Sequence, residues 1–272
     1  MLKRFFGPVA LLLDVTFLLT GCVADVVVGV DGDWGDWDSN QVEVSATFYQ
    51  EISVGSQTGL RMVGVNGAIH VRGQPGFDRV RIEAVRRVRS KTRKDAQDHL
   101  PLLQVSVKAD GSDVLVETVQ PKNANGRTYQ VDYVVTVPET FWTDVINANG
   151  SVLLKDLHAS AWVQNANGNV SLTNFTGSSR VSLGNGEIDA VIRLPDGGQL
   201  VHTVGNGGVT LTLQPQVSAT FGAQVGNGTI SLSGLDLTQS VSGKNTLYGV
   251  LGSGAGVIDL SVGNGWIHAH GK

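Results

Sequence analysis

The dipeptide Asn-Gly recurs through the second half of this chain at nearly constant intervals. From Asn149 onward successive copies are 18, 18, 21 and 21 residues apart, and a last copy follows after 37 residues. The copies are Asn149-Gly150, Asn167-Gly168, Asn185-Gly186, Asn206-Gly207, Asn227-Gly228 and Asn264-Gly265. Such a period is typical of repeat architectures, in which each unit stacks on its neighbour. Because Asn and Gly adopt a positive φ at the least cost, the backbone is expected to turn sharply at the same point of every unit.

The residues after each Asn-Gly pair alternate between apolar and polar. The second residue after the Gly is β-branched in every copy, and the fourth is Leu or Ala. Strand geometry places these two positions on one face and the residue between them on the other. The expected inward positions are Val152, Val170, Ile188, Val209, Ile230 and Ile267, followed by Leu154, Leu172, Ala190, Leu211, Leu232 and Ala269.

Two all-β architectures satisfy this pattern. In a parallel β-helix, or β-solenoid, each unit of 18–21 residues is one coil, and equivalent residues stack about 4.8 Å apart. The alternative is an antiparallel meander or sandwich, because Asn-Gly between alternating segments is also the strongest short-range hairpin signal. The equal phase of the inward positions and the nearly constant unit length favour the β-helix.

The end of the ladder is less regular. Residues 253–260 resemble a worn copy with Ala255 in place of Asn, but its Gly256 lies only nine residues before Gly265. That distance is too short for a full coil. The segment from Val257 to His270 is therefore predicted to be a hairpin that caps the stack, because an uncapped last coil would offer open strand edges to other chains.

The N-terminus has the features of a targeting segment. A basic start is followed by a largely apolar run over residues 7–19 and by Leu19-Thr20-Gly21-Cys22. This segment resembles the lipobox of bacterial lipoproteins, which implies cleavage before Cys22 and lipidation of its thiol. Val23 stands where an inner-membrane retention signal would have Asp, so the resemblance implies the outer membrane. An ordinary secretory signal or a short membrane anchor is the alternative.

Cys22 is the only cysteine of the chain. The folded body therefore has no intrachain disulfide, no cysteine metal cluster and no cysteine nucleophile.

Composition divides the chain into four parts. Residues 1–21 are the predicted signal peptide, and residues 22–40, acidic and Gly-rich, are predicted to be a flexible tether. Residues 41–138 carry long alternating runs and form an N-terminal β section, with a short surface helix expected within residues 90–100. Residues 139–272 form the Asn-Gly repeat solenoid.

The N-terminal section also carries an outlying Asn66-Gly67, which predicts a first coil there. Later, the pattern Tyr-x-Val-x-Tyr-x-Val-x-Val-Pro over residues 129–138 is followed by Asn-Ala-Asn-Gly-Ser-Val and its copies. Over roughly residues 42–271 the chain thus resembles the "putative adhesin" family of domains of unknown function, which are β-helical proteins of the bacterial envelope. The resemblance implies a β-helical fold and, through the family name, adhesion, but it implies no binding residues.

The carboxylates of the repeat do not form a catalytic column. Parallel β-helices include polysaccharide lyases and hydrolases, whose sites cluster carboxylates or a basic residue on one strand face. Glu187 and Asp189 share an outward face, whereas Asp236 and Asp259 fall at different offsets in their units. We therefore predict no catalytic residue, no cofactor and no enzymatic activity. A polysaccharide-active enzyme of β-helix type is the alternative.

His268 and His270 would share a strand face, but no Cys or acid within residues 266–272 completes a metal site, so no metal is predicted.

The largest concentration of charge in the chain is basic. It is a candidate for docking onto anionic lipid headgroups, lipopolysaccharide or acidic glycans, and a merely solvated surface is the alternative. The net charge of −4 does not favour a nucleic-acid partner. The candidate docking residues are Arg86, Arg87, Arg89, Lys91, Arg93 and Lys94.

These features together predict a lipid-anchored, non-enzymatic protein of the cell envelope that presents a β-solenoid for adhesion or scaffolding. Rows of Ser, Thr and Asn repeated by the coil would bind an extended polymer through many weak contacts. The expected partners are the membrane, through Cys22, and an envelope glycan, lipopolysaccharide or another protein.

Overall fold

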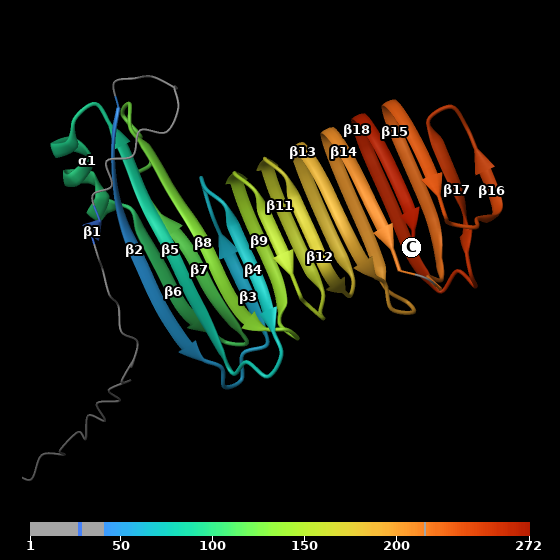
Figure 1. The fold of residues 1–272 in the computed structure, drawn as a ribbon, viewed down its shortest axis with the longest axis horizontal. Helices are drawn as coiled ribbons and strands as arrows, with labels where there is room; N and C mark the ends of the chain where they lie inside the picture. Colours follow the sequence, from blue (N-terminus) through green and yellow to red (C-terminus); the bar gives the residue numbers. More distant parts are fainter. Residues whose placement is uncertain (1–26, 29–40, 215) are drawn as a thin grey trace, which may run out of the picture.

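The computed structural model describes residues 27–28, 41–214 and 216–272 (Figure 1). The predicted signal peptide, Cys22 and most of the predicted tether therefore lie outside the described residues.

The described chain is all-β with one short helix, as the sequence predicts, and its strands form one mixed sheet. The strands are β1 (Val27–Val28), β2 (Val42–Ser53), β3 (Gly59–Val63), β4 (Ile69–Gln74), β5 (Arg79–Ser90), β6 (Gln104–Asp110), β7 (Asp113–Val119), β8 (Thr128–Pro138), β9 (Trp142–Asn149), β10 (Val152–Lys155), β11 (Ala161–Asn167), β12 (Val170–Thr176), β13 (Ser179–Arg193), β14 (Gln199–Leu213), β15 (Ala219–Ser233), β16 (Thr238–Ser242), β17 (Thr246–Leu251) and β18 (Gly256–Gly271).

The helix α1 (Arg93–His99) and a 3-10 turn, η1 (Leu100–Leu102), lie between β5 and β6. Thr92 caps α1 by accepting a hydrogen bond from the backbone N–H of Asp95, and Pro101 falls in the turn that follows. This is the short helix expected within residues 90–100. In the part of the chain that is described, no helix has the length and apolar character needed to cross a membrane.

The repeats form rungs, each with two arms that meet at an Asn-Gly corner. In the later rungs a single long strand such as β13 makes both arms, and in the earlier rungs two strands such as β11 and β12 do so. The first arms stack into one wall and the second arms into another. The first wall runs β6, β7, β3, β9, β11, then the first halves of β13, β14, β18 and β15, then β17 and β16.

The second wall runs β1, β2, β5, β8, β4, β10, β12, and then the second halves of β13, β14, β18 and β15. Alternate side chains of both walls turn toward a shared core. In β13, for example, Val181 of the first wall and Ile188 of the second are 1% and 0% exposed. Figure 1 shows the resulting long stack of slanted strands.

Pairing between the repeat rungs is parallel and in register. Asn149, Asn167 and Asn185 pair with one another, and Asn206, Asn264 and Asn227 continue the column. Antiparallel pairs occur at the two ends, among β1, β2 and β5 to β8, and among β15, β16 and β17. The expected first coil at Asn66 is present, because Asn66 bridges Asn149 in parallel.

The corners explain why Asn-Gly recurs. Gly186 has a φ of +136°, and a Cβ there would lie 2.5 Å from the carbonyl oxygen of Gly168 in the next rung. A Cβ on Gly207 would clash in the same way with the carbonyl oxygen of Gly186. Only glycine fits such a corner, since the backbone is left-handed and the neighbouring rung is too close for a side chain.

The Asn side chains form a continuous hydrogen-bonded ladder along the stack. Each amide Nδ2 donates to the Oδ1 of the Asn in the preceding rung, over 2.8–2.9 Å. In spatial order the ladder is Asn66, Asn149, Asn167, Asn185, Asn206, Asn264 and Asn227. At its N-terminal end the Asn66 amide donates to the carbonyl of Tyr129 instead.

The prediction that residues 257–270 form a capping hairpin is wrong. The strand β18 is a complete rung, and it pairs in parallel with β14 on one side and with β15 on the other. Gly256 has no positive φ and makes no corner, because the only corner of this rung is at Gly265, where φ is +143°. The short interval between Gly256 and Gly265 is therefore one arm rather than a shortened coil. The hairpin at this end of the stack is β16–β17, which pairs with β15.

Candidate binding surface on the first wall

The outward side chains of the first wall line up in columns across the rungs. One column lies five residues before the Asn of each rung, and Tyr248 of β17 completes it opposite Gly222. We call it the outer column: Arg61, Asp144, Trp162, Arg180, Val201, Asp259, Gly222 and Tyr248. Neighbours in this column are one strand spacing apart, about 4.8 Å.

A second column lies two residues further along each strand and therefore on the same face. We call it the polar column: Gln164, Ser182, Thr203, Ser261, Gln224 and Thr246. From β11 to β17 it consists of hydroxyl and amide side chains, most of them exposed, whereas the same position in β3 and β9 holds Val63 and Ile146. Among the described residues, none of these six side chains makes a hydrogen bond to the protein. Their donors and acceptors are therefore available to a ligand.

Two of the three tryptophans of the described repeat lie against a glycine of the adjacent strand. A Cβ on Gly59 would come within 2.1 Å of the Trp142 ring, and one on Gly208 within 2.2 Å of the Trp266 ring. These two indoles therefore cover backbone that would otherwise be bare. Trp162 differs, because its column neighbours are Asp144 and Arg180, and 55% of its surface is exposed.

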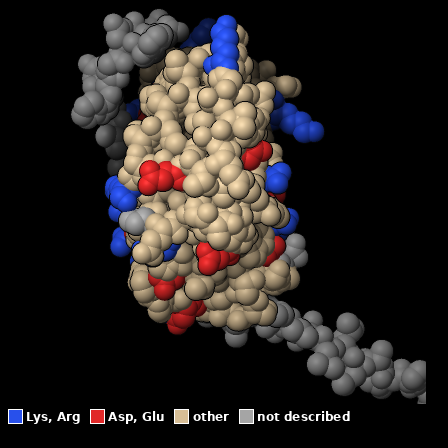
Figure 2. All heavy atoms as spheres, turned by 90° about the vertical axis from the view of Figure 1, so that its right-hand side faces the viewer, with Lys and Arg blue, Asp and Glu red and all other residues tan. Residues whose placement is uncertain are grey.

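Charges gather at the N-terminal end of the outer column. Arg61 pairs with Asp113, with 3.3 Å between Nε and Oδ2, and its guanidinium lies 5.6 Å from the centre of the Trp142 ring. Partial burial raises the pKa of Asp144, the nearby Arg61 charge opposes this shift, and the Asp113 charge adds to it. Seen from the β16–β17 end of the stack, charges of both signs are scattered and neither forms a continuous patch (Figure 2).

The carboxylates considered in the sequence lie apart. Glu187 and Asp189 are exposed on the outside of the second wall, Asp259 is in the outer column of the first wall, and Asp236 lies in the segment between β15 and β16. No group of three or more His, Cys, Asp or Glu side chains suited to a metal occurs among the described residues.

His268 and His270 lie on the outside of the second wall, in the inserted rung β18. Their ring centres are 6.4 Å apart, and Trp266 is 6.1 Å from His268. The Oγ of Ser233 lies 2.7 Å from Nδ1 of His270. They therefore share a face, as their spacing predicts, but they are not at the end of the stack.

The basic run is divided by the alternation of β5. Arg86 turns inward, is 8% exposed, and donates from Nη1 to the carbonyl of Leu103 over 3.0 Å. Arg87 pairs with Asp132 and Glu43, and Arg89 also pairs with Glu43.

The remaining three residues of the run, Lys91, Arg93 and Lys94, are exposed at the start of α1, where Lys94 pairs with Asp98. Docking of this run on an anionic surface stays a prediction, with Lys91, Arg93 and Lys94 as its most accessible members.

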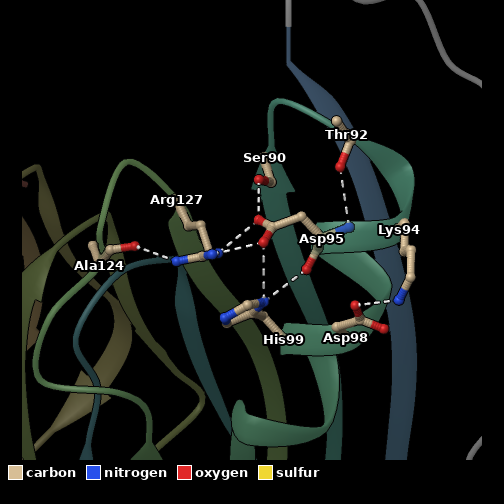
Figure 3. A network of polar contacts seen from close by, with 8 residues as sticks. All are labelled: Ser90, Thr92, Lys94, Asp95, Asp98, His99, Ala124 and Arg127. Carbon is tan, nitrogen blue, oxygen red and sulfur yellow. Dashed lines mark hydrogen bonds and ion pairs between the residues drawn. The ribbon is translucent and has the colours of Figure 1, made fainter.

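A polar network holds α1 against the sheet (Figure 3). Arg127 binds both carboxylate oxygens of Asp95, at 2.6 and 2.7 Å, and Ser90 donates a hydrogen bond to the same carboxylate. The Arg127 contact, followed by that of Ser90, holds the pKa of Asp95 well below its usual range. His99 of α1 contacts the backbone carbonyl of Asp95 through Nδ1 at 2.8 Å. We interpret the network as one that positions α1, because most of its polar groups are paired within the protein.

The outer column was not predicted from the sequence. Counting back five residues from each Asn finds Arg61, Asp144, Trp162 and Arg180, and the signal is thus present in the sequence.

Comparison with known proteins supports the fold family. No curated protein matches the chain. A "putative cell adhesion protein" from Clostridium sporogenes is 14% identical, with 82% of this chain and 99% of that chain covered and a TM-score of 0.47. A "putative adhesin" from Bacteroides fragilis is 12% identical, with 82% and 96% covered and a TM-score of 0.32. The model of the Toastrack DUF4097 family matches residues 66–268, from the first Asn-Gly corner into the inserted rung, so the chain belongs to the Toastrack DUF4097 family.

Proposed function

We propose that this chain is a non-enzymatic, lipid-anchored protein of the cell envelope that uses its stacked rungs for adhesion or scaffolding. In this proposal the sheet works as a parallel β-helix of 18–21-residue coils. The parallel register of the rungs and the Asn ladder support that description.

The observation that carries the proposal is the polar column of the first wall. Its hydroxyl and amide groups repeat at the rung spacing, and none is used in a hydrogen bond within the described chain. A periodic surface of this kind suits an extended partner, because many weak contacts made along one axis add up to firm attachment.

The adhesion proposal is tested with isolated cell envelopes. The full chain is expected to be retained on envelopes, and Trp162→Ala is expected to weaken retention because it removes the most exposed ring of the first wall. Arg193→Gln is the matched control, since Arg193 lies on the second arm of β13 and is exposed on the other wall. Equal retention of wild type and Trp162→Ala would contradict a role for the first wall.

The anchoring proposal concerns Cys22 and the exposed part of the basic run. Lipidation at Cys22 would place the protein on a membrane, where the exposed side chains of Lys91, Arg93 and Lys94 would contact anionic headgroups. Cys22→Ser is expected to move the protein from the membrane fraction to the soluble fraction and to lower its mass by the lipid. An unchanged distribution would remove the anchor from the proposal.

A polysaccharide-active enzyme remains the second candidate because of one observation. Asp113 and Asp144 lie on either side of Arg61, and burial together with the Asp113 charge raises the pKa of Asp144. A carboxyl group with a raised pKa that lies near a second carboxyl group resembles the pair with which a glycosidase carries out general acid catalysis. Turnover of a polysaccharide that is lost in Asp144→Asn would favour this candidate over adhesion.

A further inference from the structure

We propose that the first wall binds a neutral, unbranched polysaccharide laid along the stack axis between Trp162 and Tyr248. This inference rests on the proposed adhesive function and names the class of ligand that the first wall takes.

The two ends of the proposed site are exposed aromatic rings. Trp162 and Tyr248 are 55% and 46% exposed and belong to the same outer column. The Tyr248 ring leans over Gly222, whose Cβ would lie 3.2 Å from it. Four strand spacings separate Trp162 from Gly222, so the rings are about 19 Å apart. An aromatic face packs well against the C–H face of a pyranose, and a chain of several sugars is needed to reach both rings.

Hydrogen-bonding groups fill the interval between the rings. Ser182, Thr203, Ser261 and Gln224 occupy successive rungs of the polar column, beside the outer column. Hydroxyl and amide groups both donate and accept, as sugar hydroxyls do. The rung spacing is also close to the length of one pyranose unit, so successive sugars meet successive rungs.

The charge of the site favours a neutral ligand. Between the rings the outer column carries one cation, Arg180, and one anion, Asp259, separated by Val201. Each can make a charge-assisted hydrogen bond with a sugar hydroxyl. Because these two charges balance, the site offers an acidic polymer no net attraction.

The surface beside the polar column carries no side chains that would obstruct a ligand. In these rungs the residue before the corner Asn is glycine, and a Cβ at Gly205 or Gly263 would lie 2.5–2.6 Å from the carbonyl oxygen of the adjacent rung. No side chain therefore rises between the polar column and the Asn ladder from β13 to β15. A long ligand can lie flat there, without a pocket and without branches.

Calorimetry with the full chain tests this inference. The probes are cello-oligosaccharides, chito-oligosaccharides and mixed-linkage β-glucan oligomers of increasing length, with polygalacturonate as the acidic comparison. Affinity for a neutral series is expected to rise with length until the oligomer spans about 19 Å and then to level off. Added salt is expected to change it little, because the ligand carries no charge.

Variants locate the binding. Trp162→Ala and Tyr248→Ala are each expected to weaken binding of the long oligomers by about tenfold. A short oligomer reaches only one of the two rings, so only one of these two variants would weaken its binding. Thr203→Ala is a milder variant that keeps both rings. Leu102→Ala, which removes an exposed apolar side chain in η1, is the control and is expected to have no effect.

Three outcomes would overturn the inference. The first is that none of the neutral polymers binds. The second is that Trp162→Ala, Tyr248→Ala and Thr203→Ala all leave the affinity unchanged. The third is that polygalacturonate binds more tightly than the neutral polymers and that salt abolishes this binding.

Competition on isolated envelopes separates this inference from the proposed function. Retention that depends on Trp162 but is not reduced by an excess of any of the neutral oligomers would refute the glycan and keep adhesion. Absence of retention on envelopes would refute adhesion itself.

Discussion

Lowering the pH is expected to destabilise this protein through one buried histidine. His202 is fully buried on the inner side of the first wall, its Nε2 lies 2.8 Å from Oγ of Ser179, and its Nδ1 has no partner among the described residues. Burial lowers the pKa of His202 from 6.5 to about 4. The imidazole is therefore neutral in the folded protein near neutral pH.

The sign and size of the effect follow from proton linkage. Below pH 6.5 the unfolded chain takes up a proton at His202, but the folded chain does so only near pH 4. The free energy of unfolding is thus undiminished above pH 6.5 and falls as the pH is lowered through this window. Each unit of pKa shift is worth about 1.4 kcal/mol, so about 2 kcal/mol is lost by pH 5 and about 3.4 kcal/mol below pH 4.

Urea denaturation at pH 8 and at pH 5 measures this loss. The comparison variant is Ser179→Ala with His202→Leu, which removes the titrating ring and leaves no buried hydroxyl without its partner. The variant is expected to lose about 2 kcal/mol less than the wild type between the two pH values, whatever its stability at pH 8. Parallel pH profiles for the two proteins would refute the reasoning, because the acid sensitivity would then arise elsewhere.

Three further changes have defined outcomes. Gly207→Ala is expected to lower the free energy of unfolding by at least about 3 kcal/mol in urea denaturation, since its Cβ would lie 1.8 Å from the Gly186 carbonyl oxygen at a φ of +138°. Asn185→Ala removes two hydrogen bonds of the exposed Asn ladder and is expected to cost about 1 kcal/mol by the same measurement. Arg127→Gln is expected to raise the pKa of Asp95 toward its ordinary value, seen by NMR titration, and to speed amide exchange in α1.

Each of these changes has a matched control. Gly197→Ala places a Cβ at a positive φ, but nothing lies within 4 Å of that atom. The free energy of unfolding is therefore expected to fall by only about 1 kcal/mol. Asn123→Ala alters an exposed loop amide outside the ladder and is expected to change stability by less than about 0.5 kcal/mol. Lys94→Gln removes an exposed ion pair of α1 and is expected to leave the pKa of Asp95 low. Equal effects of a change and its control would contradict the corresponding explanation.

The sequence was informative wherever local backbone geometry demanded a residue type. Each corner requires glycine for its φ and for the nearness of the next rung, and so the Asn-Gly spacing predicted the register of Asn149 with Asn167 and Asn185. Alternation likewise predicted the buried second arms, including Ile188 and Val209.

What the sequence could not show is the order of the rungs in space. Nothing local distinguishes a rung that stacks on its predecessor from one that enters between two earlier rungs, and β18 does the latter. For the same reason the candidate surface could not be predicted, because Val201 has Asp259 as its neighbour although 58 residues separate them. The basic run misled for a different reason. Consecutive charges looked like one patch, whereas strand alternation sends Arg86 inward.

The position of β18 has a consequence for how the molecule is made. Its 16 residues follow β15, β16 and β17 in the chain, yet β15 is joined to β14 only through them. The native order of the rungs can therefore be completed only after β18 has been synthesised. A chain truncated before Gly256 would lack the rung that joins β15 to β14.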